Sequence, residues 1–146
     1  MKYKLENVTD RPELWAHTDP VRPELDIEFK TSPGRGVFGL VGDDGSYKAF
    51  MCYAYTSAVP RSVEDLESLT DKNGRIVIPY TVWSHEKGAG RTIIQCVLDF
   101  VHLSRVADRV VTLSPITEMA RRFHLRNDAR EFRLNESTVN FEYKIQ

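Results

Sequence analysis

The sequence has few of the features that identify secreted, metal-binding or membrane-spanning proteins. Its 146 residues include only two cysteines, Cys52 and Cys96, and neither has a second Cys or His at metal-ligand spacing, which excludes a disulfide framework and a zinc site. No apolar run approaches the roughly 18 residues of a membrane span, and "MKYKLENVTD" lacks the apolar core of a signal peptide. We therefore expect a cytoplasmic protein without membrane contact, in which both cysteines are buried, reduced thiols.

An excess of charge of one sign is also missing. Lys and Arg number 20 against 21 Asp and Glu, for a net charge of -1, so the chain as a whole does not attract nucleic acid or an anionic membrane. The arginines at 121, 122, 126, 130 and 133 fit a solvated helix face, with a cofactor phosphate or an acidic partner as alternatives. With 41% hydrophobic residues and no linker or repeat, residues 1–146 are expected to form one domain.

Periodicity predicts alternating strands and helices. Three prolines break residues 12–23 into short pieces, after a short strand at 3–5. The expected elements are strands 36–42 and 47–56 joined by "DDGS", helical turns at 63–69, a buried strand at 76–83 with a bulge or splay near Pro79, an amphipathic helix of about four turns after 90, strand 109–113, a helix capped by Ser114 with Pro115 in its first turn and ending at Asn127, and a hairpin of 130–134 with 138–145.

The stretch "HEKGAGRTII" at 85–94 places two glycines between the buried strand and the amphipathic helix. The first N–H groups of a helix have no partner inside it and carry partial positive charge, so such a turn can hold an anion, with Lys87 and Arg91 beside it. A plain connector is the alternative. The P-loop pattern is absent, and the dinucleotide fingerprint fails for want of a third glycine.

This order of elements resembles the second half of the GNAT N-acetyltransferases over about residues 36–143. The family's pyrophosphate motif, [RQ]-x-x-G-x-[GA], is matched at Gly88 and Gly90, with His85 in its first place. Its next helix is similar to N-x-x-A-x-x-[LF]-Y, whose places are held here by Thr117, Ala120, Phe123 and His124. The closing "STVNFEY" resembles the last strand of small phage-encoded members, which implies the host cytoplasm as location.

The resemblance implies an α/β fold: a mixed, mostly antiparallel central sheet flanked by helices, with a splay at the acyl-CoA site. It also implies acetyl-CoA as cofactor, with the backbone of 81–84 pairing with the pantetheine arm and the amides of 87–92 holding the pyrophosphate. The cofactor-binding residues implied are Val82, Trp83, His85, Lys87, Gly88, Ala89, Gly90, Arg91, Thr92 and Thr117. Ordinary core packing is the alternative for Trp83, and a solvated loop for His85.

The implied activity is acetyl transfer by direct attack of an amine, either a small molecule or a protein amine. His124, in the Tyr place, would bond or protonate the departing sulfur, and Tyr80 or Ser84 would help to remove the amine proton. Glu64 and Glu67, with Tyr53, are the candidates for binding the acceptor; packing or a solvated acidic face is the alternative. A second hypothesis is a GNAT-like binding module that has lost catalysis and contacts another protein, and the final hairpin offers an edge for a homodimer.

Overall fold

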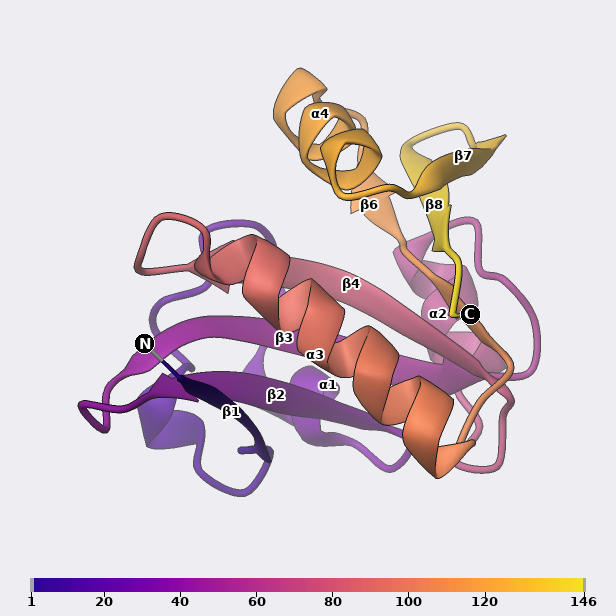
Figure 1. Cartoon of the computed structure of the whole chain (residues 1–146). Helices are drawn as coiled ribbons and strands as arrows, with labels where there is room; N and C mark the ends of the chain where they lie inside the picture. The colour runs from indigo at the N-terminus through magenta and orange to yellow at the C-terminus, as the bar shows by residue number, and fades with distance from the viewer. Residues whose placement is uncertain (1, 146) are drawn as a thin grey trace.

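The computed structural model describes residues 2–145. Its strands are β1 (Tyr3–Asn7), β2 (Arg35–Gly42), β3 (Tyr47–Thr56), β4 (Ile76–Ser84), β5 (Arg109–Val111), β6 (Ser114–Pro115), β7 (Arg130–Leu134) and β8 (Thr138–Tyr143); its helices are η1 (Pro12–Leu14), α1 (Ile27–Thr31), α2 (Val63–Leu69), α3 (Ala89–Ser104) and α4 (Glu118–Arg126). The strands form one sheet in the order β1-β2-β3-β4-β5-β8-β6, with β7 on β8 (Figure 1). β4 and β5 are parallel and the other pairs antiparallel, which confirms the predicted mixed α/β sheet.

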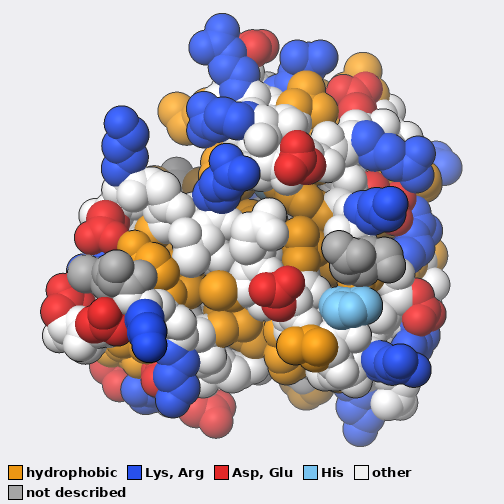
Figure 2. Space-filling model, in the orientation of Figure 1, with side chains coloured by type: hydrophobic (Ala, Val, Ile, Leu, Met, Phe, Trp, Pro, Cys, Tyr) orange, Lys and Arg blue, Asp and Glu red, His pale blue; other side chains and the backbone are white. Residues whose placement is uncertain are grey.

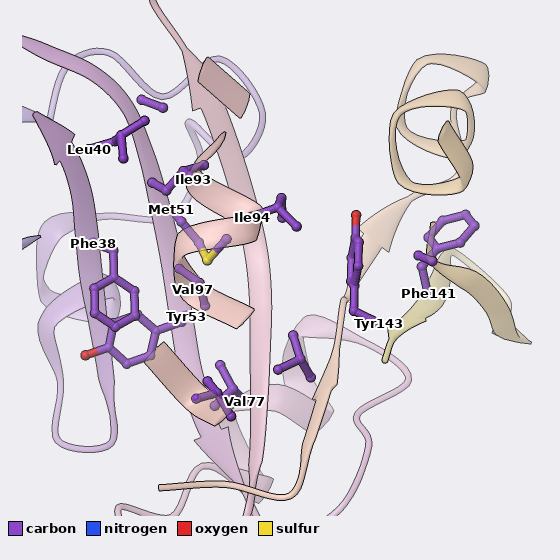
Figure 3. Packing of buried hydrophobic residues seen from close by; sticks show 14 of the residues in the cluster. Phe38, Leu40, Met51, Tyr53, Val77, Ile93, Ile94, Val97, Phe141 and Tyr143 are labelled. Atoms are coloured by element: carbon purple, nitrogen blue, oxygen red, sulfur yellow. The ribbon is translucent and has the colours of Figure 1, made fainter. Parts of the chain in front are cut away.

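Two hydrophobic cores lie on opposite faces of this sheet. α3 crosses one face (Figure 1), and its buried residues recur at helical spacing, namely Ile93, Ile94, Val97 and Val101. They pack against Phe38 and Met51 of β2 and β3 (Figure 3). The other face is covered by the segment before β2 and by α2, through residues such as Trp15 and Leu66. Each fully buried aliphatic side chain stabilises the fold by roughly 1.5–3 kcal/mol, so α3 is held firmly against the sheet.

A bulge interrupts β4 where the sequence predicts one. Thr81 lies opposite Cys52, whereas Pro79 lies opposite Tyr53, so Tyr80 is an extra residue without a partner in β3. Such a bulge bends the strand and increases its twist. Pro79 has no N–H to give to a ladder, which makes this the natural place for the irregularity.

Beyond the start of β4, the sheet opens. β4 pairs with β5 at Ile76 and Val77, and the register goes no further among the described residues. After that point β6 and β8 turn away from β4 towards α4 (Figure 1). The predicted splay near Pro79 is therefore confirmed.

The helix after β5 begins later than the sequence predicts. Ser114 and Pro115 are not its first residues but form β6, in which Ser114 pairs with Val139. The cap of α4 is Thr117, whose hydroxyl accepts the N–H of Ala120 at 3.1 Å. A Ser-Pro pair suits a helix start and also a short edge strand, because an edge proline needs no ladder donor. Pairing with β8, far along the chain, decides between the two.

Both cysteines are free thiols; Cys52 is buried and Cys96 is half-buried. Over residues 2–145, none of the helices combines the length and the apolar character needed to cross a membrane.

Candidate functional site

A cavity of about 340 Å³ lies where β4 separates from β6. We call it the β4 cavity; its walls are Pro20, Val21, Pro79, Tyr80, Thr81, Val82, Trp83, Ser84, Gly90, Ser114, Pro115, Thr117, Met119, Ala120, Phe123 and His124. None of these lining residues is Asp, Glu, Lys or Arg, and their polar side chains are hydroxyls and one imidazole. Such a cavity suits an uncharged, extended ligand segment.

The backbone of β4 forms one wall of the β4 cavity. Across the splay, the N–H of Leu113 donates to the carbonyl oxygen of Pro79 at 3.2 Å. From Tyr80 to Ser84, β4 has no strand partner on this side in the described chain. An unpaired strand edge can bind an extended ligand by main-chain hydrogen bonds, as if the ligand were another strand.

Trp83 contributes its backbone rather than its ring. Its indole Nε1 donates to the hydroxyl of Thr18 at 3.0 Å, and the ring packs on Phe50 with centroids 5.5 Å apart. The side chain thus belongs to the core on the side of the N-terminal segment. Val82, the residue before it, is half-buried and packs against the core that α3 covers, so the two side chains face opposite ways.

The two glycines of the turn have different structural roles. Gly88 is the N-cap of α3 at φ 85°, a left-handed conformation that glycine adopts without steric cost, and a Cβ there would have open space around it. Gly90 has an ordinary φ, but a Cβ would lie 3.0 Å from Cε1 of Phe123. We expected both glycines to expose the backbone to an anion. In the structure, Gly90 also allows α3 to approach Phe123 of α4 closely.

The start of α3 offers free N–H groups. Ala89 donates to the carbonyl of Glu86 and Thr92 to that of Gly88, at 3.1 and 3.2 Å. Within residues 2–145, the N–H groups of Gly90 and Arg91 find no acceptor. Free amides at the positive end of a 16-residue helix favour an anion.

Two cations flank these amides. Lys87 and Arg91 are exposed, and neither pairs with a carboxylate among the residues described. The hydroxyl of Thr92 is occupied by the carbonyl of Gly88 at 3.1 Å, and Ala89 is fully buried. The Thr92 hydroxyl proton and the Ala89 side chain are therefore not available to a phosphate.

His85 anchors the loop rather than lining the β4 cavity. Its N–H donates to the carbonyl of Lys48 at 2.8 Å, and its ring lies edge-on to Phe50 at 5.9 Å. The next residue, Glu86, accepts a hydrogen bond from the Tyr3 hydroxyl at 3.2 Å and lies 3.5 Å from the Lys48 ammonium. These contacts fix the loop to β1 and β3.

His124 lies at the wall of the β4 cavity and is only 7% exposed. Its Nδ1 lies 2.7 Å from the hydroxyl oxygen of Tyr143, and its ring stacks on Phe141 with centroids 5.1 Å apart. Burial lowers the pKa of His124 to about 4. The imidazole is therefore neutral at pH 7. It can take part in hydrogen bonds, but its protonated form, which could act as a general acid, is rare at this pH.

Of the other predicted residues, Tyr80 and Thr117 have their side chains engaged within the protein, whereas Ser84 is open to the β4 cavity. The ring of Tyr80 packs edge-on against Phe29, and its buried hydroxyl has no hydrogen-bond partner in the described chain. Burial raises the pKa of Tyr80, which argues against its action as a base. Ser84 is exposed at the end of β4, on the cavity wall. The hydroxyl of Thr117 is used to cap α4.

The predicted acceptor residues are not brought to the β4 cavity. The hydroxyl of Tyr53 accepts from the Nδ2 of Asn7 at 2.9 Å, and its ring stacks on Phe38 at 4.5 Å. Figure 3 shows Tyr53 beside Phe38, well away from Tyr143. Glu64 and Glu67 are exposed on α2; Glu64 lines a different cavity, and Glu67 lines neither.

That second cavity, of about 1080 Å³, is polar, and we call it the arginine cavity. Its lining is Arg22, Arg61, Ser62, Val63, Glu64, Asp65, Arg133, Leu134, Asn135, Glu136, Ser137 and Thr138. Arg22 joins the two cavities: its Nε donates to the carbonyl of Tyr80 at 3.3 Å and its Nη2 to that of Leu113 at 3.1 Å. Arg22 therefore bridges both sides of the splay.

Sequence reasoning missed two residues at this site. Arg22 sits in "DPVRPEL", where no periodicity marks it, and its contacts lie 58 and 91 residues away. Ser114 was assigned to a helix cap; its buried hydroxyl instead lines the β4 cavity, 2.7 Å from that of Thr112.

Figure 2 shows Lys and Arg side chains gathered at the top of the molecule, over α4. Arg121, Arg122 and Arg126 are exposed there, and Arg122 pairs with Glu118 at 3.0 Å. The predicted solvated helix face with some ion pairing describes these three arginines. It is wrong for Arg130 and Arg133, which lie on β7, and Arg133 is half-buried in the wall of the arginine cavity.

No protein-family model matches this chain, and no curated protein sequence does either. Solved structures do match. The loading GNATL domain of CurA from Lyngbya majuscula aligns at 14% identity over 100% of this chain and 99% of that chain, with a TM-score of 0.74. The GphF GNAT-like decarboxylase in complex with isobutyryl-CoA aligns at 15% identity over 98% and 100%, with a TM-score of 0.72.

An acetyltransferase also matches. The N-acetyltransferase PseH of Campylobacter jejuni, in complex with acetyl coenzyme A, aligns at 11% identity over 98% of this chain and 99% of that chain, with a TM-score of 0.63. Malonyl-CoA decarboxylase from Agrobacterium vitis is longer; the chain spans 37% of it, at 15% identity and a TM-score of 0.60. These likenesses, with the bulged and splayed β4, show that the chain has the α/β GNAT fold.

Proposed function

We propose that this chain binds an acyl-CoA thioester, with acetyl-CoA as the first choice, and transfers its acyl group to an amine. One observation carries the proposal: the unpaired edge of β4 runs from the bulge at Tyr80 directly to the free N–H groups at the start of α3. An extended arm along that edge and a pyrophosphate at that helix start fit one ligand. The acyl-CoA complexes of GphF and PseH, which share the fold, support the same choice.

The proposed residue roles follow from the cavity. Residues Tyr80–Ser84 bind the arm through the main chain, and Gly90 and Arg91 amides, with Lys87, bind the phosphates. In the transfer, the nitrogen of the neutral amine bonds to the acyl carbon, the carbon–sulfur bond breaks, and the N–H proton that the nitrogen then loses ends on sulfur. A neutral His124 donates a hydrogen bond to the sulfur when the hydroxyl of Tyr143 donates to its Nδ1. Before the attack, the ammonium form of the amine gives its extra proton to a carboxylate, and we assign this role to Glu64, which lines the arginine cavity.

Decarboxylation of a carboxyacyl-CoA is the second candidate. The observation that favours it is the lack of any acid or base other than neutral His124 in the lining of the β4 cavity. An uncharged cavity disfavours a carboxylate more than the neutral CO₂ that it releases. The electron pair of the broken carbon–carbon bond moves to the carbon beside the thioester, which then takes a proton. GphF, with a TM-score of 0.72, is a GNAT-like decarboxylase.

Calorimetric titration with acetyl-CoA and with CoA tests the binding step. Micromolar binding of either is expected, and no binding would overturn both candidates. Thiol release over a panel of amines then supports the transferase, whereas formation of acetyl-CoA from malonyl-CoA without an amine supports the decarboxylase. Binding without either reaction would favour the alternative of a binding module that has lost catalysis.

A further inference from the structure

Arg22 is a buried cation without a carboxylate partner. The residue is 9% exposed, and it forms no ion pair among the described residues. A guanidinium has five N–H donors. Its Nε and Nη2 each donate to a carbonyl oxygen. Its Nη1 has no acceptor among the described residues, and this atom is not completely shielded from solvent. The free donors of Arg22 therefore reach the arginine cavity, whose wall it forms.

The nearby carboxylate of Asp19 does not neutralise Arg22. Its Oδ2 lies 2.8 Å from the ammonium of Lys30, and its Oδ1 accepts the hydroxyl of Thr81 at 3.0 Å. Oδ1 also accepts the N–H groups of Val21 and Arg22, which fixes the turn that carries Arg22. Buried charges are normally paired, because removing a charge from water costs several kcal/mol. Here burial lowers the pKa of Arg22, and among residues 2–145 no carboxylate offsets that cost by direct contact.

Two further arginines line the same cavity. Arg133 donates to the Oδ1 of Asn135 at 2.9 Å and to the carbonyl of Val59 at 3.0 Å, and it pairs with no carboxylate in the described chain. Burial, and then the positive charge of neighbouring Arg61, lower the pKa of Arg133. Arg61 is exposed and likewise unpaired within residues 2–145. Glu64, Asp65 and Glu136 also line this cavity, but among the described residues none of them forms an ion pair with the three guanidinium groups, so the free guanidinium donors stay available to an anionic ligand.

We propose that the arginine cavity is a carboxylate-binding site, in which Arg22 contacts the carboxylate and Arg61 and Arg133 supply further positive charge. The planar fork of a guanidinium matches a carboxylate in geometry. The inference rests on the proposed function and names its substrate class: one reactant carries a free carboxylate. Because Arg22 bridges Tyr80 and Leu113, that carboxylate lies next to the acyl end of the β4 cavity. It belongs either to the far end of the acyl group or to the amine acceptor.

The site itself is tested without any CoA compound. Sodium malonate, and sodium chloride at equal ionic strength, are titrated into the whole chain while the arginine Nε–H signals are followed by NMR. Malonate is expected to shift the Nε–H signals of Arg22 and Arg133. The shift of the Arg133 signal should be lost in Arg22→Gln, and both shifts should weaken several-fold in Arg61→Gln, an exposed position that should not disturb folding. Arg126→Gln, outside both cavities, is the control. No shift with malonate, or a response unchanged in both variants, overturns the inference.

Affinities then distinguish the two sources of the carboxylate. If it belongs to the acyl group, malonyl-CoA binds about tenfold more tightly than acetyl-CoA, and Arg22→Lys or Arg61→Gln reduces the ratio. If it belongs to the acceptor, the two thioesters bind alike, and glycine binds the acetyl-CoA complex about tenfold more tightly than ethylamine. If neither of these two preferences is found, the inference is overturned. Failure of acetyl-CoA to bind would instead overturn the proposed function, while the malonate titration still decides the carboxylate site.

Discussion

The Nδ1 of His124 lies 2.7 Å from the hydroxyl oxygen of Tyr143, and the two side chains share this contact inside the protein. Burial lowers the pKa of His124 and raises that of Tyr143, so both are neutral at pH 7. The pair links α4 to β8 at the wall of the β4 cavity. It therefore has a consequence for stability as well as for the proposed chemistry.

Protonation of His124 should destabilise the fold. Its pKa is about 4 in the folded chain against an ordinary value of 6.5, so the unfolded chain binds the extra proton first as the pH falls. Stability is fully present above pH 6.5 and is lost between pH 6.5 and 4, by about 3 kcal/mol in total. Urea unfolding at intervals over this range measures it.

The control for this prediction is His124→Gln, which cannot titrate. Several carboxylates also lose their charge near pH 4, so the informative quantity is the difference in unfolding free energy between the two proteins. That difference should shrink or reverse towards pH 4. A difference that stays constant from pH 7 to pH 4 contradicts the lowered pKa of His124.

The same substitution tests the catalytic role of His124. In His124→Gln, turnover in the acyl-transfer assay should fall about a hundredfold, because the sulfur loses its hydrogen-bond donor. Acetyl-CoA affinity should stay within about twofold, since in the proposed binding mode the main chain of β4, and not this side chain, binds the arm. Unchanged turnover would leave His124 with a packing role.

Gly88 and Gly45 form a matched pair for testing the turn. Both have a positive φ, 85° and 81°, and open space where a Cβ would lie. Replacing either with Ala should destabilise the chain by about 1 kcal/mol through backbone strain. Only Gly88→Ala should also weaken CoA binding, because only Gly88 adjoins the free amides of α3. Equal CoA affinity of the two variants would remove the pyrophosphate from this turn.

Removal of the Lys30 ammonium should be costly. Lys30 is 2% exposed, and its Nζ lies 2.8 Å from Asp19, so Lys30→Met leaves a buried carboxylate without its partner. We expect a loss of about 3–5 kcal/mol in unfolding free energy. The double variant Lys30→Met with Asp19→Asn should recover part of it. A cost below about 1 kcal/mol for Lys30→Met would show that water reaches Asp19.

The elements predicted correctly are those with a local cause. "DDGS" makes a hairpin, the apolar spacing after Gly90 makes α3, and the missing N–H of Pro79 locates the bulge. The errors arose where distant residues decide. Ser114 became a strand residue by pairing with Val139, and Tyr53 faces Asn7 because of its position in β3. Arg22 could not be found from the sequence, since its two acceptors lie in β4 and just before β6.

The unpaired edge of β4 and the free amides of α3 share one property: both belong to the main chain. Amide and carbonyl groups are the same in every residue type except proline, so most substitutions along Tyr80–Ser84 would leave them in place. The proposed binding surface would therefore tolerate extensive sequence drift while its shape persists. The CurA domain keeps the fold of this chain, with a TM-score of 0.74, at an identity of only 14%. Searches for relatives of this chain should therefore weigh strand geometry above residue identity.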